Sequence, residues 1–375
     1  MVLTEPQMKL KQQAREFAKR EIEPKAEEYD KSGDFPHDNV EKIFSQGYGG
    51  MILPKEYGGA GLDNISYNIV LEEISNACAA TGCILAVHTS VGTYPIYEFG
   101  TPEQKDKYLP LLTSTCLGAF AVTEPGAGSD IKGIQTKARQ DGNDFIMDGA
   151  KTFITNGTAA ETVVVVARTN INSDNEFTAF IVESGMEGFS IGKVEDKMGI
   201  RASQAVELIF DSVRVPKDNI LGRVGEGIKV ALVSLDGGRV GIASQALGIA
   251  QAALEEAVSY SKQRIQFEKP ISSFQAIQFK LADMATKIEA ARHLIYYAAS
   301  LKDQGQNYTK EAAMAKLFAS EMAVGVVREA LQIHGGHGYM RGSKVERLYR
   351  DVKITEIYEG TNEVQRMVIA RKALK

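Results

Sequence analysis

The sequence predicts a mainly helical protein with a central β-domain. Residues 1–118 have helical texture, with loops at Pro/Gly clusters such as PKEYGGAG at 54–61. Residues 119–226 change to short β-branched and aromatic runs, such as FTAFIVES and QAVELIFDSVRVP, separated by Gly, Asn and Asp. Helical texture returns from residue 227, and no proline follows Pro270, which permits long uninterrupted helices. We therefore expect three domains, at 1–118, 119–226 and 227–375.

Length and composition limit the class of protein. At roughly 150 residues per domain, 375 residues favour two or three domains with a sizeable core. The formal charge of −5, from 43 basic and 48 acidic residues, argues against a protein that wraps nucleic acid. No apolar stretch approaches the ~20 residues of a membrane span, so we expect no contact with a membrane.

The cysteines and the first residues predict a cytoplasmic protein. Cys78, Cys83 and Cys116 form no CxxC pair and leave one thiol unpaired, as is typical of a reducing compartment. The first segment, MVLTEPQMKLKQQAREF, mixes acids and bases and lacks the apolar region of a signal peptide.

Apolar residues at helical spacing predict two helices of a C-terminal bundle. The first set advances in alternating steps of three and four: Phe274, Ile277, Leu281, Met284, Ile288, Ala291, Ile295 and Ala298. The second set consists of Ala312, Ala315, Ala319, Met322 and Val326. Two successive stripes of this kind indicate a helical bundle. Strand and helix do not alternate, and no GxGxxG follows a strand, so the pattern excludes a Rossmann fold.

Two segments of the β-domain have the composition of ligand-binding loops. FAVTEPGAGSD at 120–130 contains Gly126 and Gly128, which let backbone amides approach an anion or an aromatic ring, beside the hydroxyls of Thr123 and Ser129. A simple turn explains the same residues. KTFITNG at 151–157 reads as a strand that ends in an Asn-Gly turn, which a plain hairpin also explains.

Glu359 is the candidate general base. It follows Tyr358 and precedes Gly360 and Thr361. A carboxylate beside a glycine and an aromatic ring can project into a tight apolar cleft, where burial raises its pKa towards the range of a useful base. The alternative is a solvated loop acid, for which Glu356 and Glu363 are candidates.

Three further segments carry weaker signals. QIHGGHGY at 332–339 contains His334 and His337, but no Cys or carboxylate completes a metal shell, so we expect no metal and favour a close backbone approach to a ligand. Arg264 follows a helix, where an arginine either binds a pyrophosphate or complements the helix dipole. Asp236 of DGGR is predicted at a helix start, where it can serve as an N-cap.

Together these segments resemble the acyl-CoA dehydrogenase family over essentially the whole chain. The matching segments, in the family's order, are AVTEPGAGSD, KTFITNG, EDKMGIRASQ (195–204), LDGGR (235–239), SKQRIQFEKP (261–270), FQAIQFKLADM (274–284), QIHGGHGY and IYEGTNEVQR (357–366). LDGGRVGIASQALGIAQAAL is most similar to short-chain, butyryl-CoA-type members. The resemblance implies an N-terminal helical domain, a β-barrel-like middle domain and a C-terminal four-helix bundle.

The resemblance also implies FAD, bound between the subunits of a homotetramer. The contacts implied within one subunit are Phe120, Val122, Thr123, Gly128, Ser129, Phe153, Ile154, Thr155, Thr361 and Glu363. The contacts implied with the FAD of a neighbouring subunit are Arg264, Phe267, Gln275, Gln332, Ile333, Gly335 and Gly336. The residues implied for the acyl-CoA substrate are Ser129, Asp236, Arg239, Tyr358 and Gly360. Many members have tryptophan at the position of Phe153.

The implied reaction is the α,β-dehydrogenation of an acyl-CoA to a trans-2-enoyl-CoA. Glu359 would remove the α-proton, while its backbone N–H and a ribityl hydroxyl of FAD polarise the thioester carbonyl. The β-hydrogen would leave as hydride to the flavin, which would pass its electrons to an electron-transfer flavoprotein. The same motifs fit an enoyl-CoA reductase that runs in reverse, with electron bifurcation, on butenoyl-, acrylyl- or aryl-acrylyl-CoA. A flavin oxidase or monooxygenase on this fold, and a non-enzymatic scaffold, are further alternatives that the retained Glu359 disfavours.

A few residues depart from the family's pattern. Glu268 stands where glycine is usual, and a carboxylate there would repel the FAD phosphates unless it turns outward. His334 and His337 replace apolar or small residues, and His88 lies on the helix that borders the acyl pocket in the family. These departures leave the acyl group open among short straight, branched, cyclic and aromatic chains.

Overall fold

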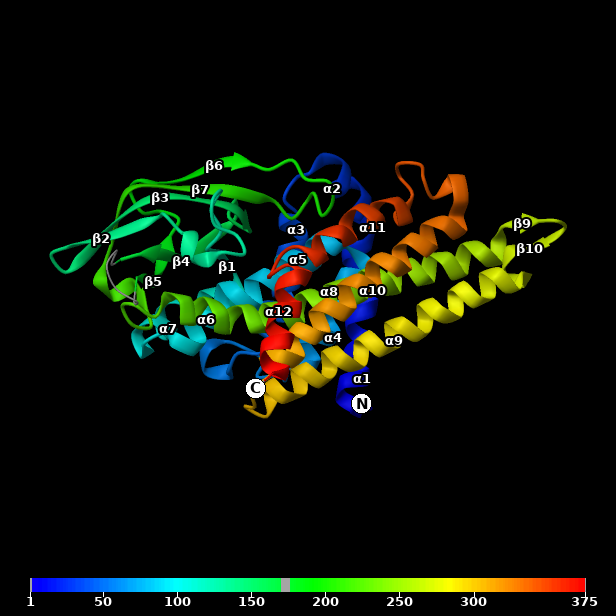
Figure 1. Ribbon diagram of the computed structural model, residues 1–375, viewed down its shortest axis with the longest axis horizontal. Coiled ribbons are helices and arrows are strands. Elements are labelled where there is room, and N and C mark those ends of the chain that lie inside the picture. Colours follow the sequence, from blue (N-terminus) through cyan, green and yellow to red (C-terminus); the bar gives the residue numbers. More distant parts are fainter. Residues whose placement is uncertain (1, 170–175, 375) are drawn as a thin grey trace.

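The computed structural model describes residues 2–169 and 176–374, and the elements follow the predicted order of helices, strands and helices (Figure 1). Short helices form the first part of the chain: α1 (Glu5–Phe17), α2 (Ala26–Ser32), α3 (His37–Ser45), α4 (Asn64–Ala77), α5 (Ala79–Val87), α6 (Tyr94–Phe99) and α7 (Pro102–Ser114). Capping boxes at Thr4 and Thr101 begin α1 and α7. A π-helical segment, His88–Thr93, joins α5 to α6.

The middle of the chain forms one mixed sheet. Its strands are β1 (Leu117–Ala121), β2 (Lys137–Asp141), β3 (Asp144–Thr155), β4 (Ala160–Arg168), β5 (Phe177–Glu183), β6 (Phe189–Val194), β7 (Ala205–Val215) and β8 (Ile220–Leu221). The strand order is β6-β7-β3-β2-β4-β5-β8, and β1 pairs with β4 in parallel. The turn after β3 does not make a hairpin with β4, because β2 lies between the two strands.

The predicted buried strand forms the centre of this sheet. The side chains of β4 alternate between two apolar clusters, with Val163 and Val165 on one face and Val164 and Val166 on the other. All four valines are fully buried, which explains why the run shows no polar alternation.

The last part of the chain is a helical bundle. It contains α8 (Gly227–Gln263), α9 (Gln275–Asp303), α10 (Thr309–His334), α11 (Lys344–Val352) and α12 (Asn362–Ala373), with the two-stranded hairpin β9 (Ile265–Gln266) and β10 (Lys269–Pro270) between α8 and α9. α8 packs against α4, α9 and α10. Both predicted apolar stripes are confirmed: on α9 the stripe is buried from Met284 onward, and all five residues of the α10 stripe are buried.

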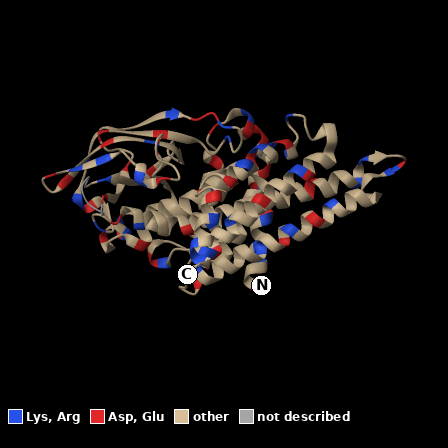
Figure 2. Ribbon diagram, in the orientation of Figure 1, with Lys and Arg blue, Asp and Glu red and all other residues tan. Residues whose placement is uncertain are grey.

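The sheet and the hairpin lie at opposite ends of the molecule, with the long helices running between them (Figure 1). Acidic and basic residues are interspersed along the ribbon (Figure 2). Within the described residues, none of the helices combines the length and apolar character that crossing a membrane requires.

Candidate functional site

Glu359 lies in a strained loop between a 3-10 turn (Lys353–Glu356) and α12. Its φ of +55° is in the left-handed region, and Gly360 follows with a φ of +91°. The Gln365 amide holds this loop by donating from Nε2 to the Gly360 carbonyl at 2.8 Å and to the Glu359 carbonyl at 3.3 Å. Thr361 caps the first turn of α12 by accepting from the Val364 N–H. The backbone therefore projects the Glu359 side chain in one direction, towards α8.

The Glu359 carboxylate packs directly on a glycine of α8. A Cβ atom at Gly238 would lie 2.5 Å from Glu359 Oε2, so only glycine leaves room for the carboxylate. Oε2 is buried and has no hydrogen-bond partner in the part of the chain that the structure describes. Burial raises the pKa of Glu359 to about 7, against the opposing charges of Arg239 and Lys316. A carboxyl with this pKa exchanges protons readily at neutral pH.

Other polar groups near Glu359 also lack partners. The Tyr67 hydroxyl, the Thr89 hydroxyl and the Arg239 Nε are buried and form no hydrogen bond among the described residues. Tyr67, Thr89 and Gly237 border a small cavity between α4, α8 and the π-helical segment. Buried polar groups are normally satisfied, so this cluster is suited to a ligand that brings hydrogen-bonding atoms.

The DGGR segment lies inside α8, not at its start. Asp236 is in the third turn of a helix that begins at Gly227, so the predicted N-cap role is wrong. Asp236 instead forms an ion pair with Arg239 and accepts a hydrogen bond from Thr309 of α10 at 2.7 Å. Sequence alone missed this because glycines at 237 and 238 look like a helix boundary, whereas tertiary packing on α8 requires them. Tyr358 is tied to the same helix through a hydrogen bond from its hydroxyl to Gln245.

The glycine-rich loop and the end of β3 form a second surface, suited to a flat ring. The Thr152 N–H donates to the Thr123 carbonyl at 2.9 Å, which joins the loop to β3. The pairing of β3 with β7 is irregular at this point, and Phe153 has a φ of +58° and a side chain that is 61% exposed. No atom stands within 4 Å of a Cβ built at Gly126 or Gly128. An exposed aromatic side chain beside an open glycine loop fits the isoalloxazine ring of a flavin.

A buried ion pair supports that loop. Lys151 Nζ donates to Glu124 Oε1 at 2.8 Å and to the Val122 carbonyl at 3.0 Å. Glu124 also accepts from the backbone N–H groups of Gln135 and Thr136. No local pattern signals this pair, since its members are distant in the chain and each has the residue type of a surface position.

Replacing Lys151 by methionine is expected to lower the free energy of unfolding by about 3 kcal/mol, because it leaves the Glu124 carboxylate buried without its cation. Chemical denaturation of the purified protein measures this loss. The matched control is Lys137→Met at an exposed position of β2, which should change stability by less than about 0.5 kcal/mol. If Lys151→Met lowers the free energy of unfolding by less than about 1 kcal/mol, the ion pair does not support the loop as described.

The remaining cofactor candidates lie together at the other end of the molecule. Arg264 ends α8, Gln275 begins α9, and Phe267 is at the tip of the β9–β10 hairpin, 86% exposed. Gln332, Gly335 and Gly336 are exposed at the end of α10, whereas Ile333 is buried and can offer a ligand only its backbone. A single chain therefore does not bring this group to the sheet that carries the glycine-rich loop (Figure 1).

The family models match the whole organisation of the chain. The acyl-CoA dehydrogenase N-terminal domain matches residues 4–115, the middle domain residues 119–213 and the C-terminal domain residues 225–374. The chain belongs to the acyl-CoA dehydrogenase family. It is thereby an FAD-dependent oxidoreductase that acts on CH–CH bonds.

Relatives in this family carry several activities. The short-chain specific acyl-CoA dehydrogenase of Clostridium acetobutylicum is 48% identical, covering 100% of this chain and 99% of the relative. The 3-(aryl)acrylate reductase of Clostridium sporogenes is 49% identical, covering 100% of both chains.

Solved structures give the same fold. Butyryl-CoA dehydrogenase from Megasphaera elsdenii is 46% identical, with a TM-score of 0.98 and full coverage of both chains. A chain of the structure described as "Electron transferring flavoprotein of Acidaminococcus fermentans: towards a mechanism of flavin-based electron bifurcation" is 50% identical, with a TM-score of 0.98, covering 100% of this chain and 99% of that one.

The departures from the acyl-CoA dehydrogenase pattern have local structural roles. His88 turns away from the cavity that its neighbour Thr89 borders: its Nε2 lies 3.1 Å from the Gly49 carbonyl, and its Nδ1 accepts from the Gly118 N–H at 3.0 Å. Burial lowers the His88 pKa to about 4, so the ring is neutral. His88 thus links the π-helical segment to β1.

The other departures lie at the hairpin end. The His334 ring stacks on Tyr260 at 4.3 Å between centroids, and His337 meets the same ring edge-on. The described residues hold no group of three or more His, Cys, Asp or Glu side chains arranged for a metal. Glu268 is exposed with a φ of +65° beside Phe267 at +52°, the backbone of a type I′ turn, in which glycine is favoured.

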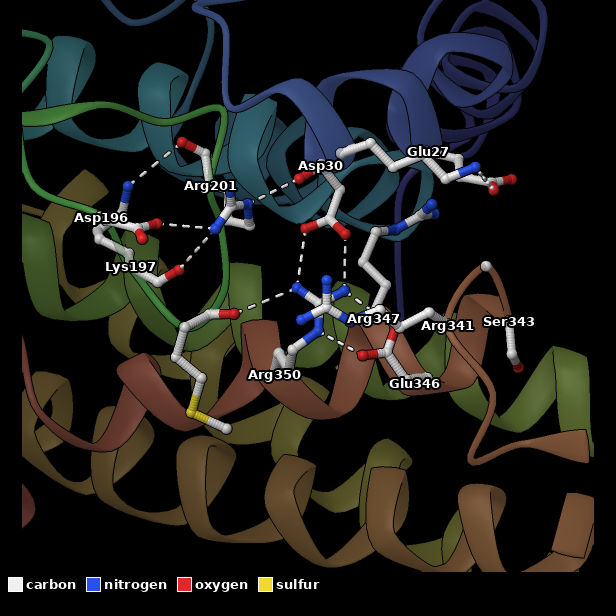
Figure 3. A pocket seen from close by; sticks show the side chains of 13 residues that line it. Glu27, Asp30, Asp196, Lys197, Arg201, Arg341, Ser343, Glu346, Arg347 and Arg350 are labelled. Carbon is white, nitrogen blue, oxygen red and sulfur yellow. Dashed lines mark hydrogen bonds and ion pairs between the residues drawn. The ribbon is translucent and has the colours of Figure 1, made fainter. Parts of the chain in front are cut away.

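The EDKMGIRASQ segment of the family pattern joins the three regions of the chain. Figure 3 shows a surface pocket in which Arg350 of α11 donates to both carboxylate oxygens of Asp30 of α2, at 2.9 and 2.6 Å. Arg201, from the loop before β7, donates to the Asp30 carbonyl at 2.8 Å and to Asp196 at 2.8 Å. Because Asp30, Arg201 and Arg350 satisfy one another, they connect the regions structurally and are separate from the Glu359 site.

Proposed function

We propose that the chain oxidises a short-chain acyl-CoA to the trans-2-enoyl-CoA, with Glu359 as the base that removes the α-proton. The observation that carries this proposal is the buried, unpaired Oε2 of Glu359, held against Gly238 by a left-handed loop. FAD, when bound, accepts the β-hydrogen as hydride. The relatives named short-chain specific acyl-CoA dehydrogenase and butyryl-CoA dehydrogenase support a short acyl group.

The neighbouring residues orient the thioester. The Glu359 backbone N–H polarises the thioester carbonyl, which makes the α-proton more acidic. Ser129, Asp236, Arg239, Tyr358 and Gly360 contact the acyl-CoA, with Arg239 fixed by its ion pair to Asp236. The closely packed α8 surface at Gly237 and Gly238 excludes water from the reacting carbons.

The FAD site is completed by a second copy of the chain in a homotetramer. Phe120, Val122, Thr123, Gly128, Ser129, Phe153, Ile154, Thr155, Thr361 and Glu363 contact FAD from one subunit. Arg264, Phe267, Gln275, Gln332, Ile333, Gly335 and Gly336 contact it from the neighbour. The exposed Phe267 ring on a projecting hairpin supports such an intersubunit contact. An electron-transfer flavoprotein accepts the electrons, as the name of one structural relative suggests.

A second candidate is the reverse reaction, the reduction of an enoyl-CoA with electrons from an electron-transfer flavoprotein. The relative named 3-(aryl)acrylate reductase favours it. A Glu359 pKa of about 7 also serves it, because both the proton-accepting and the proton-donating forms are present at neutral pH.

Anaerobic titration of the purified yellow protein with butyryl-CoA tests the proposed function. Bleaching of the flavin band with appearance of a long-wavelength charge-transfer band supports the short-chain dehydrogenase. A flavin-loaded protein that butyryl-CoA does not bleach contradicts it, and branched, cyclic and aryl-acyl thioesters then identify the substrate class.

The rate of flavin reduction is expected to rise with pH and to level off above about pH 7. Below its pKa, Glu359 already carries a proton and cannot accept another, so the rate falls about tenfold per pH unit. The reduction of trans-2-butenoyl-CoA by the reduced enzyme should show the opposite trend, with a decline above about pH 7. Stopped-flow rates from pH 5.5 to 9 measure both trends, and a flat profile in both directions contradicts the assignment of Glu359.

A further inference from the structure

A lysine buried near the base has no role in the reaction described above. Lys316 of α10 is 0% exposed, yet its ammonium forms no ion pair within residues 2–169 and 176–374. Its Nζ donates to Oδ1 of Asn362, the first residue of α12, at 2.9 Å. Ser320, one turn further along α10, donates to the same oxygen at 3.0 Å. A buried ammonium with only a neutral partner is costly, which calls for a compensating charge nearby.

The charges that face Lys316 come from three elements. Glu356 and Glu359 lie on the segment before α12, Glu363 lies on α12, and Arg239 lies on α8. Three of these groups are compensated elsewhere: Glu356 by Lys353, Arg239 by Asp236, and the exposed Glu363 by water. Lys316 and Glu359 remain, one buried cation and one buried acid that form no ion pair with any described residue.

We propose that Lys316 is a positioning residue for the general base, fixing the start of α12 to α10 and adding to Arg239 a second positive charge that the Glu359 carboxylate faces. The inference deepens the proposed function and rests on Glu359 as the base. The hydrogen bond to Asn362 sets the position of the loop only three residues beyond Glu359. The uncompensated charge stabilises the ionised carboxylate, which is the form that accepts the α-proton.

The electrostatic effect has a defined sign. Burial raises the pKa of Glu359 to about 7, and the charges of Arg239 and Lys316 act in the opposite direction. Burial likewise lowers the pKa of Lys316 to about 8, while Glu359 is the first of the charges that oppose this change. Removing the ammonium of Lys316 takes away one of the two charges that lower the Glu359 pKa, so the pKa rises further.

The test is Lys316→Met in the FAD-loaded enzyme, because methionine keeps the length and the packing of the side chain without its charge. Infrared difference titration without substrate reports the protonated Glu359 carboxyl, identified as the band that Glu359→Gln removes. We expect the midpoint to rise from about 7 by about one pH unit. Flavin reduction by butyryl-CoA should then fall about fivefold at pH 7 and recover by pH 9.

Two further variants separate charge from packing. Ser320→Ala removes the other hydrogen bond to Asn362 and keeps the ammonium, so the midpoint should stay unchanged. Lys316→Gln keeps a hydrogen-bond donor towards Asn362 without the charge, and it should raise the midpoint as Lys316→Met does.

The outcomes are distinct. A Lys316→Met midpoint within about 0.2 pH units of the wild type, or an equal shift in Ser320→Ala, overturns the inference. If Lys316→Met does not fold, Lys316→Gln decides by the same criterion. The infrared titration does not depend on turnover of a substrate. If butyryl-CoA fails to reduce the wild-type enzyme, the proposed function is contradicted, but the infrared midpoints still test the role of Lys316.

Discussion

Replacement of Glu359 by glutamine is expected to slow flavin reduction by butyryl-CoA about 10³-fold, while FAD stays bound. Glutamine has the same shape but cannot accept the α-proton. The left-handed loop, its Gln365 hydrogen bonds and the close contact with Gly238 belong to the backbone and to α8, so the substitution leaves them in place. Anaerobic stopped-flow absorbance measures the rate, and the visible spectrum measures the bound flavin.

The matched control is Glu356→Gln on the same segment, where the carboxylate forms an ion pair with Lys353 at the surface. Its flavin reduction should stay within about threefold of the wild type, since a surface pair contributes little. A binding measurement with a non-reducing acyl-CoA analogue should give similar affinity for the wild type and Glu359→Gln. Glu359→Gln enzyme that keeps more than a tenth of the wild-type rate would remove Glu359 from the role of base.

The Gly238→Ala variant is expected to lose about 100-fold in flavin reduction although it folds normally. The added methyl group would lie 2.5 Å from Glu359 Oε2 and 2.9 Å from Cδ, so the carboxylate must move by on the order of 1 Å. The position lies within α8, where alanine is favoured over glycine by about 1 kcal/mol. Thermal stability should therefore hold or rise while the rate falls, a combination that general misfolding cannot produce.

Gly237→Ala is the control for that variant. A Cβ atom at Gly237 would lie 3.3 Å from Lys302 Nζ, the far end of a flexible side chain that can shift by a few tenths of an ångström. We expect a loss of at most a few-fold from this neighbouring substitution. Equal losses at 237 and 238 would contradict the idea that contact with the base makes position 238 critical.

Much of the fold could be predicted from local sequence patterns. The apolar stripes of α9 and α10 follow from the 3.6-residue period, and the buried valines of β4 follow from a sheet covered on both faces, so both are visible in the sequence. The absence of proline after Pro270 allowed the two long helices α9 and α10. The pairing of β3 with β2 and β7 was not visible, because strand order depends on contacts between distant residues and not on the turn that follows β3.

The candidate site, like the fold, was predictable from the sequence only in part. Glu359 was recognisable because a glutamate between an aromatic residue and a glycine, in a family motif, is a local signal. The predicted N-cap role of Asp236 is wrong, because Gly237 and Gly238 resemble a helix boundary locally, while Gly238 in fact lies inside α8 in close contact with Glu359. The domain limits and the individual cofactor contacts stay predictions.

The sequence by itself determined the order of helical and β regions, the apolar stripes and the acid that is the candidate base, since each depends on residues close together in the chain. Only the tertiary structure revealed the Lys151–Glu124 support, the outward turn of Phe153 and the buried Lys316 beside Glu359. These features depend on burial and on charges brought together from distant segments. The pKa of a carboxyl group depends on this burial and on these charges, and no local pattern of residues encodes either of them.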